Sequence, residues 1–186
     1  MKTIYFVTGN KNKFAEFENK LKGLEIKSIQ KDIGYPEIQS DSLEEVVKFG
    51  IEDIKHRFDG SFIIEDAGLF IEALLNFPGV YSKFVFYSIG LDGVLKLLEK
   101  TENRKATFRS VFGLYEPNKK SKFFIGECKG HIPSEEKGKH GFGYDPIFIP
   151  DDTNKTFAEM TIDEKNKYSH RAKALEKLIL YLKTNK

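Results

Sequence analysis

The chain has 186 residues, 31% of them charged, yet 30 basic residues nearly cancel 28 acidic ones and leave a formal net charge of +2. A hydrophobic content of 40% with 17 Phe is too high for a disordered chain, and we expect a single domain over residues 1–186. A mean hydropathy of −0.42 argues against a membrane protein. The small net charge gives no general case for a nucleic-acid polymer as partner.

Cysteine and histidine usage narrows the chemistry further. Cys128 is the single cysteine, so no intrachain disulfide can form and cysteine-based zinc sites are excluded. The four histidines are far apart and form no HxxxH pair, which argues against a zinc enzyme. The first residues enter a strand pattern without the apolar stretch of a signal peptide, so we expect a cytoplasmic protein with a reduced thiol.

The predicted elements alternate in type, which favours an α/β fold. Ile4–Val7 is a β-branched and aromatic run typical of a strand, and Phe14, Phe17 and Leu21 then recur at helical spacing. The elements predicted after these are a strand at 25–29, a helix at 43–54, a buried strand at 61–64, a helix at 92–99, strands at 105–115 and 121–127, a short strand at 147–149, and helices after Thr161 and Ser169. Ser42 and Thr161, each three residues before a Glu, predict capping boxes.

Two polar segments directly follow predicted strands. Residues 8–13, Thr-Gly-Asn-Lys-Asn-Lys, combine a glycine, a helix N-terminus and lysines, which suits phosphate binding, although the spacing matches neither GxxxxGK[ST] nor GxGxxG. Glu65 and Asp66 follow an apolar run, so we expect them at the carboxyl end of a buried strand, where α/β proteins build sites. Glu37, after a turn, is a candidate for the same place. Each segment alone also fits an ordinary polar turn.

Two later segments place aromatic rings and cations near each other in the sequence. The loop Gly141–Pro146 sets Phe142 and Tyr144 beside glycines, where a ring can stack on a planar ligand or complete the core. Lys165 and then His170-Arg171 surround the start of the last predicted helix. A cation in a first helical turn opposes the helix dipole by about 0.3–1 kcal/mol, so a nearby anion or ligand acceptor explains this placement.

In this order the segments resemble the inosine triphosphate pyrophosphatase family, the HAM1-like pyrophosphatases of non-canonical purine nucleoside triphosphates. Each motif alone is weak, but the ordered set is specific and covers nearly the whole chain. The motifs are Thr8-Gly9-Asn10 with Lys13, Glu65-Asp66-Ala67-Gly68-Leu69, Phe77-Pro78-Gly79-Val80-Tyr81-Ser82, Gly141-Phe142-Gly143-Tyr144-Asp145-Pro146, Thr156-Phe157-Ala158-Glu159-Met160, Glu164-Lys165-Asn166 and Ser169-His170-Arg171.

The resemblance implies a strongly twisted mixed sheet flanked by helices, with two lobes around a central cleft, in a homodimer. It implies Mg²⁺-dependent hydrolysis of ITP, dITP and XTP to the nucleoside monophosphate and pyrophosphate, which cleanses the nucleotide pool. Asp66 then matches the proton acceptor, Glu37 and Asp66 match the metal ligands, and Glu65 is a further candidate ligand. The implied substrate-binding positions are Thr8, Gly9, Asn10, Lys11, Asn12, Lys13, Ala67, Phe142, Gly143, Tyr144, Asp145, Lys165, His170 and Arg171.

Two positions depart from the family pattern. Ala67 stands where many members carry a hydroxyl residue, so a side-chain contact with substrate is lost there. Phe49 stands where many members carry a phosphate-contacting lysine. Lys48 beside it is not a substitute, because one residue turns a helical side chain by about 100°.

Rival functions remain at this point. A nucleotide-binding sensor without turnover would use the same pocket, although pure binding needs no proton acceptor such as Asp66. A pyrophosphatase of other modified or ordinary triphosphates is a second alternative. An RNA-binding protein is a third, but its basic stripe is missing, because acidic residues are mixed among the lysines throughout.

Overall fold

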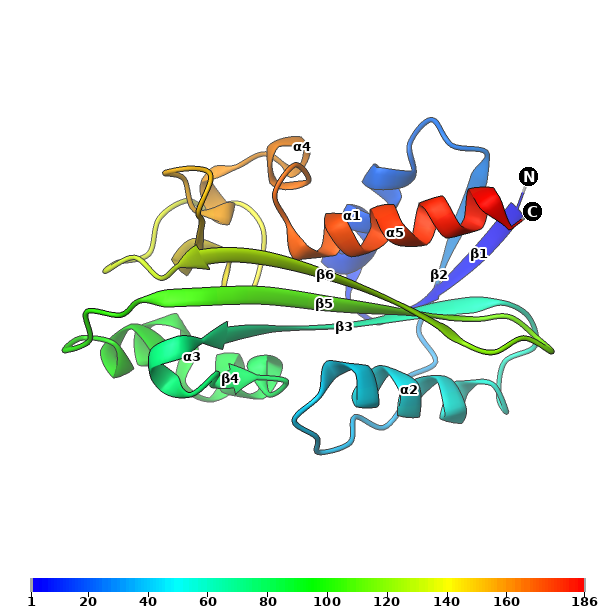
Figure 1. The fold of residues 1–186 in the computed structure, drawn as a ribbon, viewed down its shortest axis with the longest axis horizontal. Helices are drawn as coiled ribbons and strands as arrows, with labels where there is room; N and C mark the ends of the chain where they lie inside the picture. The colour runs from blue at the N-terminus through cyan, green and yellow to red at the C-terminus, as the bar shows by residue number, and fades with distance from the viewer. Residues whose placement is uncertain (1, 186) are drawn as a thin grey trace.

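The computed structural model describes residues 2–185, which fold around a seven-stranded mixed sheet (Figure 1). The strand order is β2-β1-β3-β5-β6-β7, with β4 paired to β3. The strands are β1 (Lys2–Val7), β2 (Ile26–Lys31), β3 (Phe62–Ile71), β4 (Pro78–Gly79), β5 (Lys105–Tyr115), β6 (Lys122–His131) and β7 (Ile149–Pro150). β1 runs parallel to β2 and β3, whereas β3, β5, β6 and β7 are successively antiparallel.

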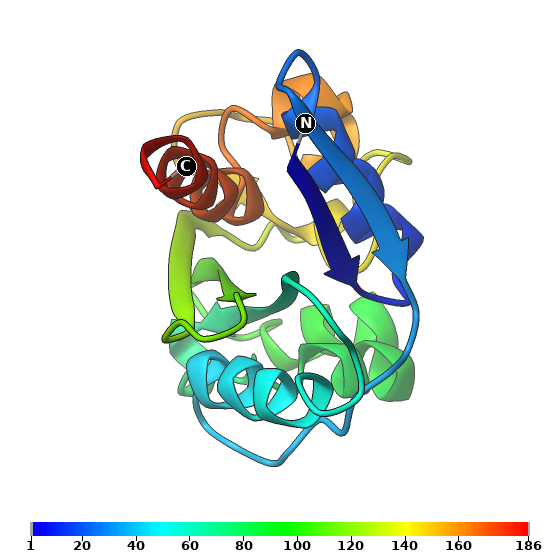
Figure 2. The same ribbon diagram turned by 90° about the vertical axis from the view of Figure 1, so that its right-hand side faces the viewer.

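Helices cover both faces of this sheet. They are α1 (Lys11–Leu21), α2 (Leu43–Ile54), α3 (Ser82–Leu97), α4 (Ile162–Lys165) and α5 (His170–Thr184). Figures 1 and 2 show α1, α4 and α5 on one side of the long strands and α2 and α3 on the other. The predicted α/β class, with a twisted mixed sheet between helices, is confirmed.

The two helical layers pack on alternate residues of β3. Ile63 belongs to a core cluster with residues of α1 and α5, whereas Ile64 packs with Val47 and Ile51 of α2. Successive side chains of a strand point to opposite faces, so this alternation continues into the polar residues that follow. The layer in which each polar side chain lies is therefore determined by its position along β3.

Side-chain caps determine where several helices begin. The Asn10 carboxamide oxygen accepts hydrogen bonds from the N–H groups of Asn12 and Lys13, which begins α1. The Ser169 hydroxyl caps α5, as predicted, and the Thr161–Glu164 capping box is present. Of the two hydrogen bonds in the capping box predicted at Ser42, only one is formed. The Ser42 hydroxyl accepts from the Glu45 N–H, but the Glu45 carboxylate accepts a hydrogen bond from Ser40 instead.

Several predicted boundaries were wrong, among them the end of the strand predicted at 121–127, which continues to His131 as β6. The strand predicted at 61–64 continues to Ile71, because β5 pairs with every residue of β3 from Phe62 onward. The helix predicted at 92–99 begins at Ser82 and ends at Leu97, with a break at Gly90, where φ is 65°. The strand predicted at 147–149 is reduced to Ile149–Pro150, preceded by a 3-10 turn at Asp145–Ile147 that contains a proline.

The longer β3 has an interrupted edge on the side away from β5. β1 pairs with it only at Phe62 and Ile63, and β4 pairs with it only at Leu69 and Phe70. Within the described residues, the stretch 64–68 has no neighbouring strand on that edge. Glu65 and Asp66 therefore lie in the middle of a strand, at a gap in the sheet, and not at a carboxyl end as we expected.

Candidate active site

A cavity of about 850 Å³ opens at the gap beside β3. Its walls come from the β1–α1 loop and the start of α5 on one side, and from the start of α3 and residues 34–37 on the other. The cleft thus runs between the two helical layers. Of the predicted site residues, those that line it are Thr8, Gly9, Asn10, Lys11, Asn12, Lys13, Glu37, Glu65, Asp66, Ala67, Phe142, Gly143, Tyr144, Asp145, His170 and Arg171. Lys165 lies behind this lining, and the side chains of Phe49 and Lys48 also lie outside it.

The loop from Thr8 to Lys13 forms one end of the cleft. The Thr8 hydroxyl accepts a hydrogen bond from the Asn10 N–H, and Asn10 caps the helix, so these two side chains hold the loop in shape. A Cβ on Gly9 would lie 3.0 Å from the carboxylate of Asp32, an exposed side chain that would have to shift. Lys11 is exposed at the mouth of the cleft. The amides of Thr8, Asn10, Asn12 and Lys13 donate within the protein, so the loop offers an anion the amides of Gly9 and Lys11 and the Lys11 side chain.

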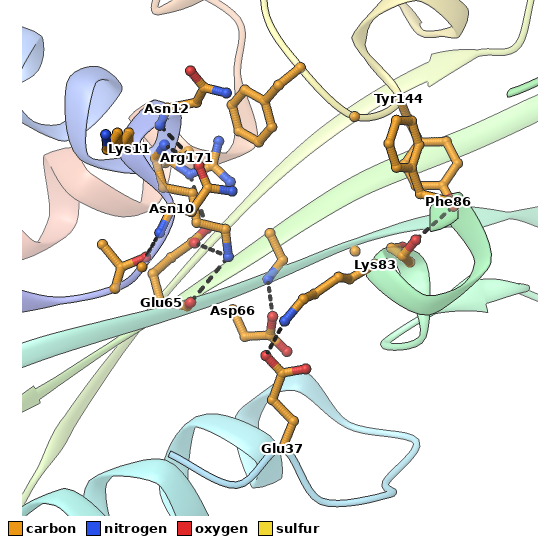
Figure 3. Close-up of a pocket in the computed structure, with 18 of the residues that line it drawn as sticks. Asn10, Lys11, Asn12, Glu37, Glu65, Asp66, Lys83, Phe86, Tyr144 and Arg171 are labelled. Carbon is orange, nitrogen blue, oxygen red and sulfur yellow. Dashed lines mark hydrogen bonds and ion pairs between the residues drawn. The ribbon is translucent and has the colours of Figure 1, made fainter. Parts of the chain in front are cut away.

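Glu65 and Asp66 are neighbours in sequence but point into different layers (Figure 3). Glu65 is 3% exposed and fully paired. Its Oε1 accepts from the Ser110 hydroxyl at 2.6 Å and from Arg171 Nε at 3.1 Å, and its Oε2 lies 2.8 Å from Lys13 Nζ. Burial alone would raise the pKa of Glu65, but Arg171 and Lys13 lower it to about 2. Glu65 is therefore a permanent carboxylate that holds two cations of the cleft.

Asp66 has a different environment. One of its oxygens accepts a hydrogen bond from the Ala67 N–H at 2.9 Å, and the other has no hydrogen-bond partner in the described part of the chain. Burial raises the pKa of Asp66 to about 6, with a contribution from the charges of Glu65 and Glu37 and an opposing one from Lys13. A carboxyl group with a pKa near neutrality and a free oxygen is suited to accept a proton.

Glu37 lies across the cleft from Asp66. Figure 3 shows the two carboxylates directed toward one another, with the side chain of Lys83 beside them. Lys83 Nζ is 3.2 Å from Glu37 Oε1, and both side chains are exposed. The charges of Glu65 and Glu37 both contribute to the raised pKa of Asp66, which indicates that negative charge gathers around this carboxyl group.

This pair fits a hard divalent cation. Mg²⁺ keeps several waters and needs only one or two protein carboxylates, and Glu37 and Asp66 supply that number. Among the described residues, no group of three or more His, Cys, Asp or Glu side chains could hold a metal. Glu65 is engaged by Lys13 and Arg171, so we leave it out of the candidate metal site.

A buried charge network forms the wall behind the other end of the cleft. Lys165 Nζ lies 2.6 Å from Glu16 and 2.7 Å from Asp145, and Arg171 Nη1 lies 2.5 Å from the second oxygen of Glu16. Burial alone would raise the pKa of Glu16, but Arg171 and Lys165 hold it below its usual range. With Glu65 and Lys13, the network contains three acids and three bases. From the sequence, we expected an anion or a ligand acceptor near Lys165 and Arg171. Carboxylates of the protein itself fill that role.

His170 and the aromatic loop complete this end. The His170 ring stacks on Phe108 with centroids 4.5 Å apart, and its Nδ1 is buried without a hydrogen-bond partner. Burial, together with Arg171 and Lys165, lowers the pKa of His170 well below 6.5, so the ring is neutral near pH 7. Tyr144 is 5% exposed and donates a hydrogen bond to the Ser82 carbonyl, so its ring is largely used in packing. Phe142 is the more accessible of the two rings.

The sequence reasoning missed several residues that build the cleft. Glu16 lies one residue before Phe17 on the buried side of α1, and an acid next to a core position was the available signal. Lys83 stands in the first turn of α3, but the dipole argument used for Arg171 could not single it out, because this helix was expected to start at residue 92. Other lining residues that gave no signal are Asp32, Tyr35, Phe86, Tyr87 and Phe108; Val80 belongs to a segment that carries the family resemblance but was not named as a site residue.

The protein is thus an α/β protein in which a charged cleft large enough for a small ligand lies between two helical layers. The model of the Ham1 family matches residues 4–181. The "dITP/XTP pyrophosphatase" of Pyrococcus horikoshii is 52% identical, with 98% of this chain and 97% of that protein aligned. That of Methanopyrus kandleri is 49% identical, with 98% and 97% aligned.

Solved structures agree with this assignment. The Ham1 protein of Staphylococcus aureus has a TM-score of 0.85 at 28% identity, with 100% of each chain covered. A HAM1 protein from Coxiella burnetii has a TM-score of 0.81 at 34% identity, with 99% of this chain and all of that chain covered. The chain belongs to the Ham1 family.

Proposed function

We propose that this protein hydrolyses the non-canonical purine nucleoside triphosphates ITP, dITP and XTP to the nucleoside monophosphate and pyrophosphate. The observation that carries the proposal is one cleft that combines a lysine-bearing loop at a helix start, the facing carboxylates of Glu37 and Asp66, and hydrogen-bond donors at the start of α5. The relatives named dITP/XTP pyrophosphatase support this substrate class, since they align with 98% of the chain. Residues 1–186 would act as a single domain.

At the loop end, the amides of Gly9 and Lys11 and the Lys11 and Lys13 ammonium groups would bind the phosphates. Asp66 would take a proton from the water that attacks the α-phosphorus. The bond from that phosphorus to the oxygen bridging to the β-phosphate then breaks, and pyrophosphate leaves. Glu37 and Asp66 would hold Mg²⁺, which when bound polarises phosphoryl oxygens and neutralises charge on the leaving group.

At the other end, the base would lie against Phe142, Gly143 and the start of α5. Arg171 uses Nε and Nη1 for protein carboxylates, which leaves Nη2 as a donor, and neutral His170 can donate through a ring nitrogen. Donors match the 6-oxo group of hypoxanthine and xanthine and oppose the 6-amino group of adenine. Lys165 and Asp145 would act by holding Arg171 and the Phe142 loop in place.

A substrate panel tests the function. Pyrophosphate release is measured for ITP, dITP, XTP, ATP and GTP, with and without Mg²⁺. We expect Mg²⁺-dependent release with the first three and much slower release with the last two. Asp66→Asn should lower turnover by about 10²–10⁴-fold, the usual worth of a proton acceptor, while binding of ITP stays measurable by calorimetry. Near-wild-type turnover of Asp66→Asn would contradict the role of Asp66.

The assembly and location form a separate part of the proposal. We infer a homodimer that acts in the cytoplasm on free nucleotides, with no nucleic-acid polymer and no membrane as partner. Among residues 2–185, every helix is too short or too polar to cross a membrane. Size-exclusion chromatography with light scattering tests the dimer, and a monomer mass at micromolar protein would refute it.

A further inference from the structure

Tyr35 lines the same cleft as the carboxylates of Glu37, Glu65 and Asp66. It is half-buried, and its hydroxyl has no hydrogen-bond partner among the described residues. Burial, and then the charges of Asp66, Glu37 and Glu65, raise the pKa of Tyr35, so the hydroxyl keeps its proton at neutral pH. The cleft therefore contains a neutral, unpaired hydroxyl within the field of three carboxylates.

The backbone around Tyr35 is held in place by a side chain that follows α2. Arg57 donates from Nη1 to the Ile33 carbonyl at 3.2 Å and from Nη2 to the Gly34 carbonyl at 2.7 Å. Pro36 comes directly after Tyr35 and restricts the backbone of Tyr35 to extended conformations. The position of the tyrosine on the cleft wall is therefore determined on both sides of the residue.

The ring of Tyr35 packs on α2 at a glycine. A Cβ on Gly50 would lie 2.8 Å from Cδ2 and Cε2 of Tyr35 and 2.7 Å from Cδ1 of Ile64. Glycine destabilises a helix interior, and Gly50 lies inside α2 without a positive φ that would require it. The close approach of the two side chains explains this glycine, because any larger residue at position 50 would displace the Tyr35 ring from α2.

Asp66 alone does not determine how an attacking water is oriented. Its free oxygen can accept one of the two hydrogens of the water, and the second hydrogen needs another acceptor. Glu65 is engaged by Lys13 and Arg171, and Glu37 is paired with Lys83 across the cleft (Figure 3). The Tyr35 oxygen is an unpaired acceptor on the same cleft wall, and its ring is held by α2.

We propose that Tyr35 positions the attacking water and that Gly50 positions Tyr35. Asp66 takes one hydrogen of the water as a proton, and Tyr35 Oη accepts a hydrogen bond from the other, which leaves a lone pair of the water for the α-phosphorus. The water oxygen forms the new bond to phosphorus, the bond to the bridging oxygen breaks, and Tyr35 keeps its own proton throughout. This inference rests on the proposed function for its reaction and substrate.

Removal of one hydroxyl tests the first part. Tyr35→Phe keeps the ring, and kcat for ITP with Mg²⁺ should fall about tenfold, since one hydrogen bond to the attacking water is lost. An ITP analogue with a methylene group between the α- and β-phosphates should bind within about twofold of wild type in calorimetry, because Tyr35 acts on the water and not on the nucleotide. Tyr115→Phe is the matched control. Tyr115 is also half-buried, packs against the same core cluster and lies outside the cleft lining, so neither quantity should change.

A second substitution tests the part played by α2. Gly50→Ala displaces the ring, so it should lower kcat about tenfold when Tyr35 is present. In the Tyr35→Phe background the same change should lower kcat by less than about twofold, because the hydroxyl is already absent. Thermal unfolding should show the same loss of stability in both backgrounds, since the ring remains, and circular dichroism verifies that every variant is folded.

The outcomes separate a water-positioning tyrosine from one that only packs or binds substrate. A kcat of Tyr35→Phe within about twofold of wild type would overturn the proposal, and so would a fall in analogue affinity as large as the fall in kcat. Losses that multiply to about a hundredfold in the double variant would overturn the link between Gly50 and the hydroxyl. The proposed function is read separately from wild-type pyrophosphate release, so a wild type that hydrolyses ITP with an unchanged Tyr35→Phe variant refutes this inference alone.

Discussion

Removal of the Glu16 charge tests the buried network most directly. Glu16 is 6% exposed and lies 2.6 Å from Lys165 and 2.5 Å from Arg171. Glu16→Gln keeps the size but offers one acceptor in place of two, and its NH₂ group faces a cation. The network of three acids and three bases is then left with one uncompensated buried positive charge, so we expect the free energy of unfolding to fall by about 3–5 kcal/mol.

Equilibrium unfolding in urea at pH 7 measures this loss, and the chain contains a matched control. Lys20 Nζ is also 2.6 Å from a carboxylate, that of Glu176, but this carboxylate is 58% exposed. Glu176→Gln should therefore lower stability by no more than about 1 kcal/mol. An equal and small effect of both substitutions would refute the argument that burial makes the Glu16 pair strong.

A double-mutant cycle sharpens the test. Lys165→Met removes the opposite charge, so the double variant Glu16→Gln/Lys165→Met has a balanced network again. It should be more stable than the sum of the single effects predicts by about 1–3 kcal/mol, and additive effects would contradict the coupling. The pKa of Glu16 is lowered by folding, so its contribution is present above the unfolded value of 4.5 and is lost as pH falls through the folded pKa. The gap between wild type and Glu16→Gln should therefore narrow in acid.

Three further predictions concern the start of α5. Arg171→Lys keeps the charge but loses the planar fork, so the preference for ITP over ATP in kcat/KM should narrow; an unchanged ratio would remove Arg171 from base recognition. His170 is held neutral, whereas the unfolded chain binds a proton at this residue below pH 6.5, so the stability of wild type relative to His170→Phe should fall by about 1.4 kcal/mol by pH 5.5 in urea unfolding; a difference that does not change with pH would contradict the buried neutral ring. A Cβ at Gly126 would lie 2.1 Å from the His170 carbonyl and 2.4 Å from the Ala174 nitrogen, so Gly126→Ala should cost about 1–3 kcal/mol and lower the Tm, and a wild-type Tm would show that α5 can move away.

Local signals in the sequence predicted much of the fold. Periodicity located β1, α1, β5 and β6, and side-chain caps located the starts of α2, α4 and α5. Ala172, Leu175 and Leu178 of α5, which recur at helical spacing, are buried. These features depend on residues a few positions apart, which is the range over which sequence patterns carry information.

The boundaries that failed depend on distant partners. β3 continues past Ile64 because it pairs with residues of β5 that lie 35 to 47 positions further along the chain, and because Lys13 and Arg171 neutralise Glu65. Local propensity cannot show that a charged residue will be compensated from another element. The first half of α3 was missed for a different reason: its exposed apolar residues Phe84 and Tyr87 do not form a helical core stripe.

For the candidate site, too, local sequence signals predicted some features and contacts between distant residues determined others. Its residue types were visible in the sequence, and those nominated lie along one cleft, with Lys165 behind it. Their division of labour was not visible, because it follows from pairing across the fold. Glu65 was grouped with Asp66 as a metal candidate, yet the structure ties Glu65 to Lys13 and Arg171 and leaves Asp66 with a free oxygen.

The placement of Glu65 and Asp66 on opposite faces of β3 makes the site sensitive to chain length. A deletion or insertion of one residue in the first part of β3 would shift the pairing with β5 by one position and exchange the faces of all that follows. Asp66 would then face Lys13 and Arg171, and Glu65 would face Glu37. Along this strand, we therefore expect related chains to differ by substitutions and by even-numbered length changes, while single-residue length changes destroy the distinction between a neutralised and a reactive carboxylate.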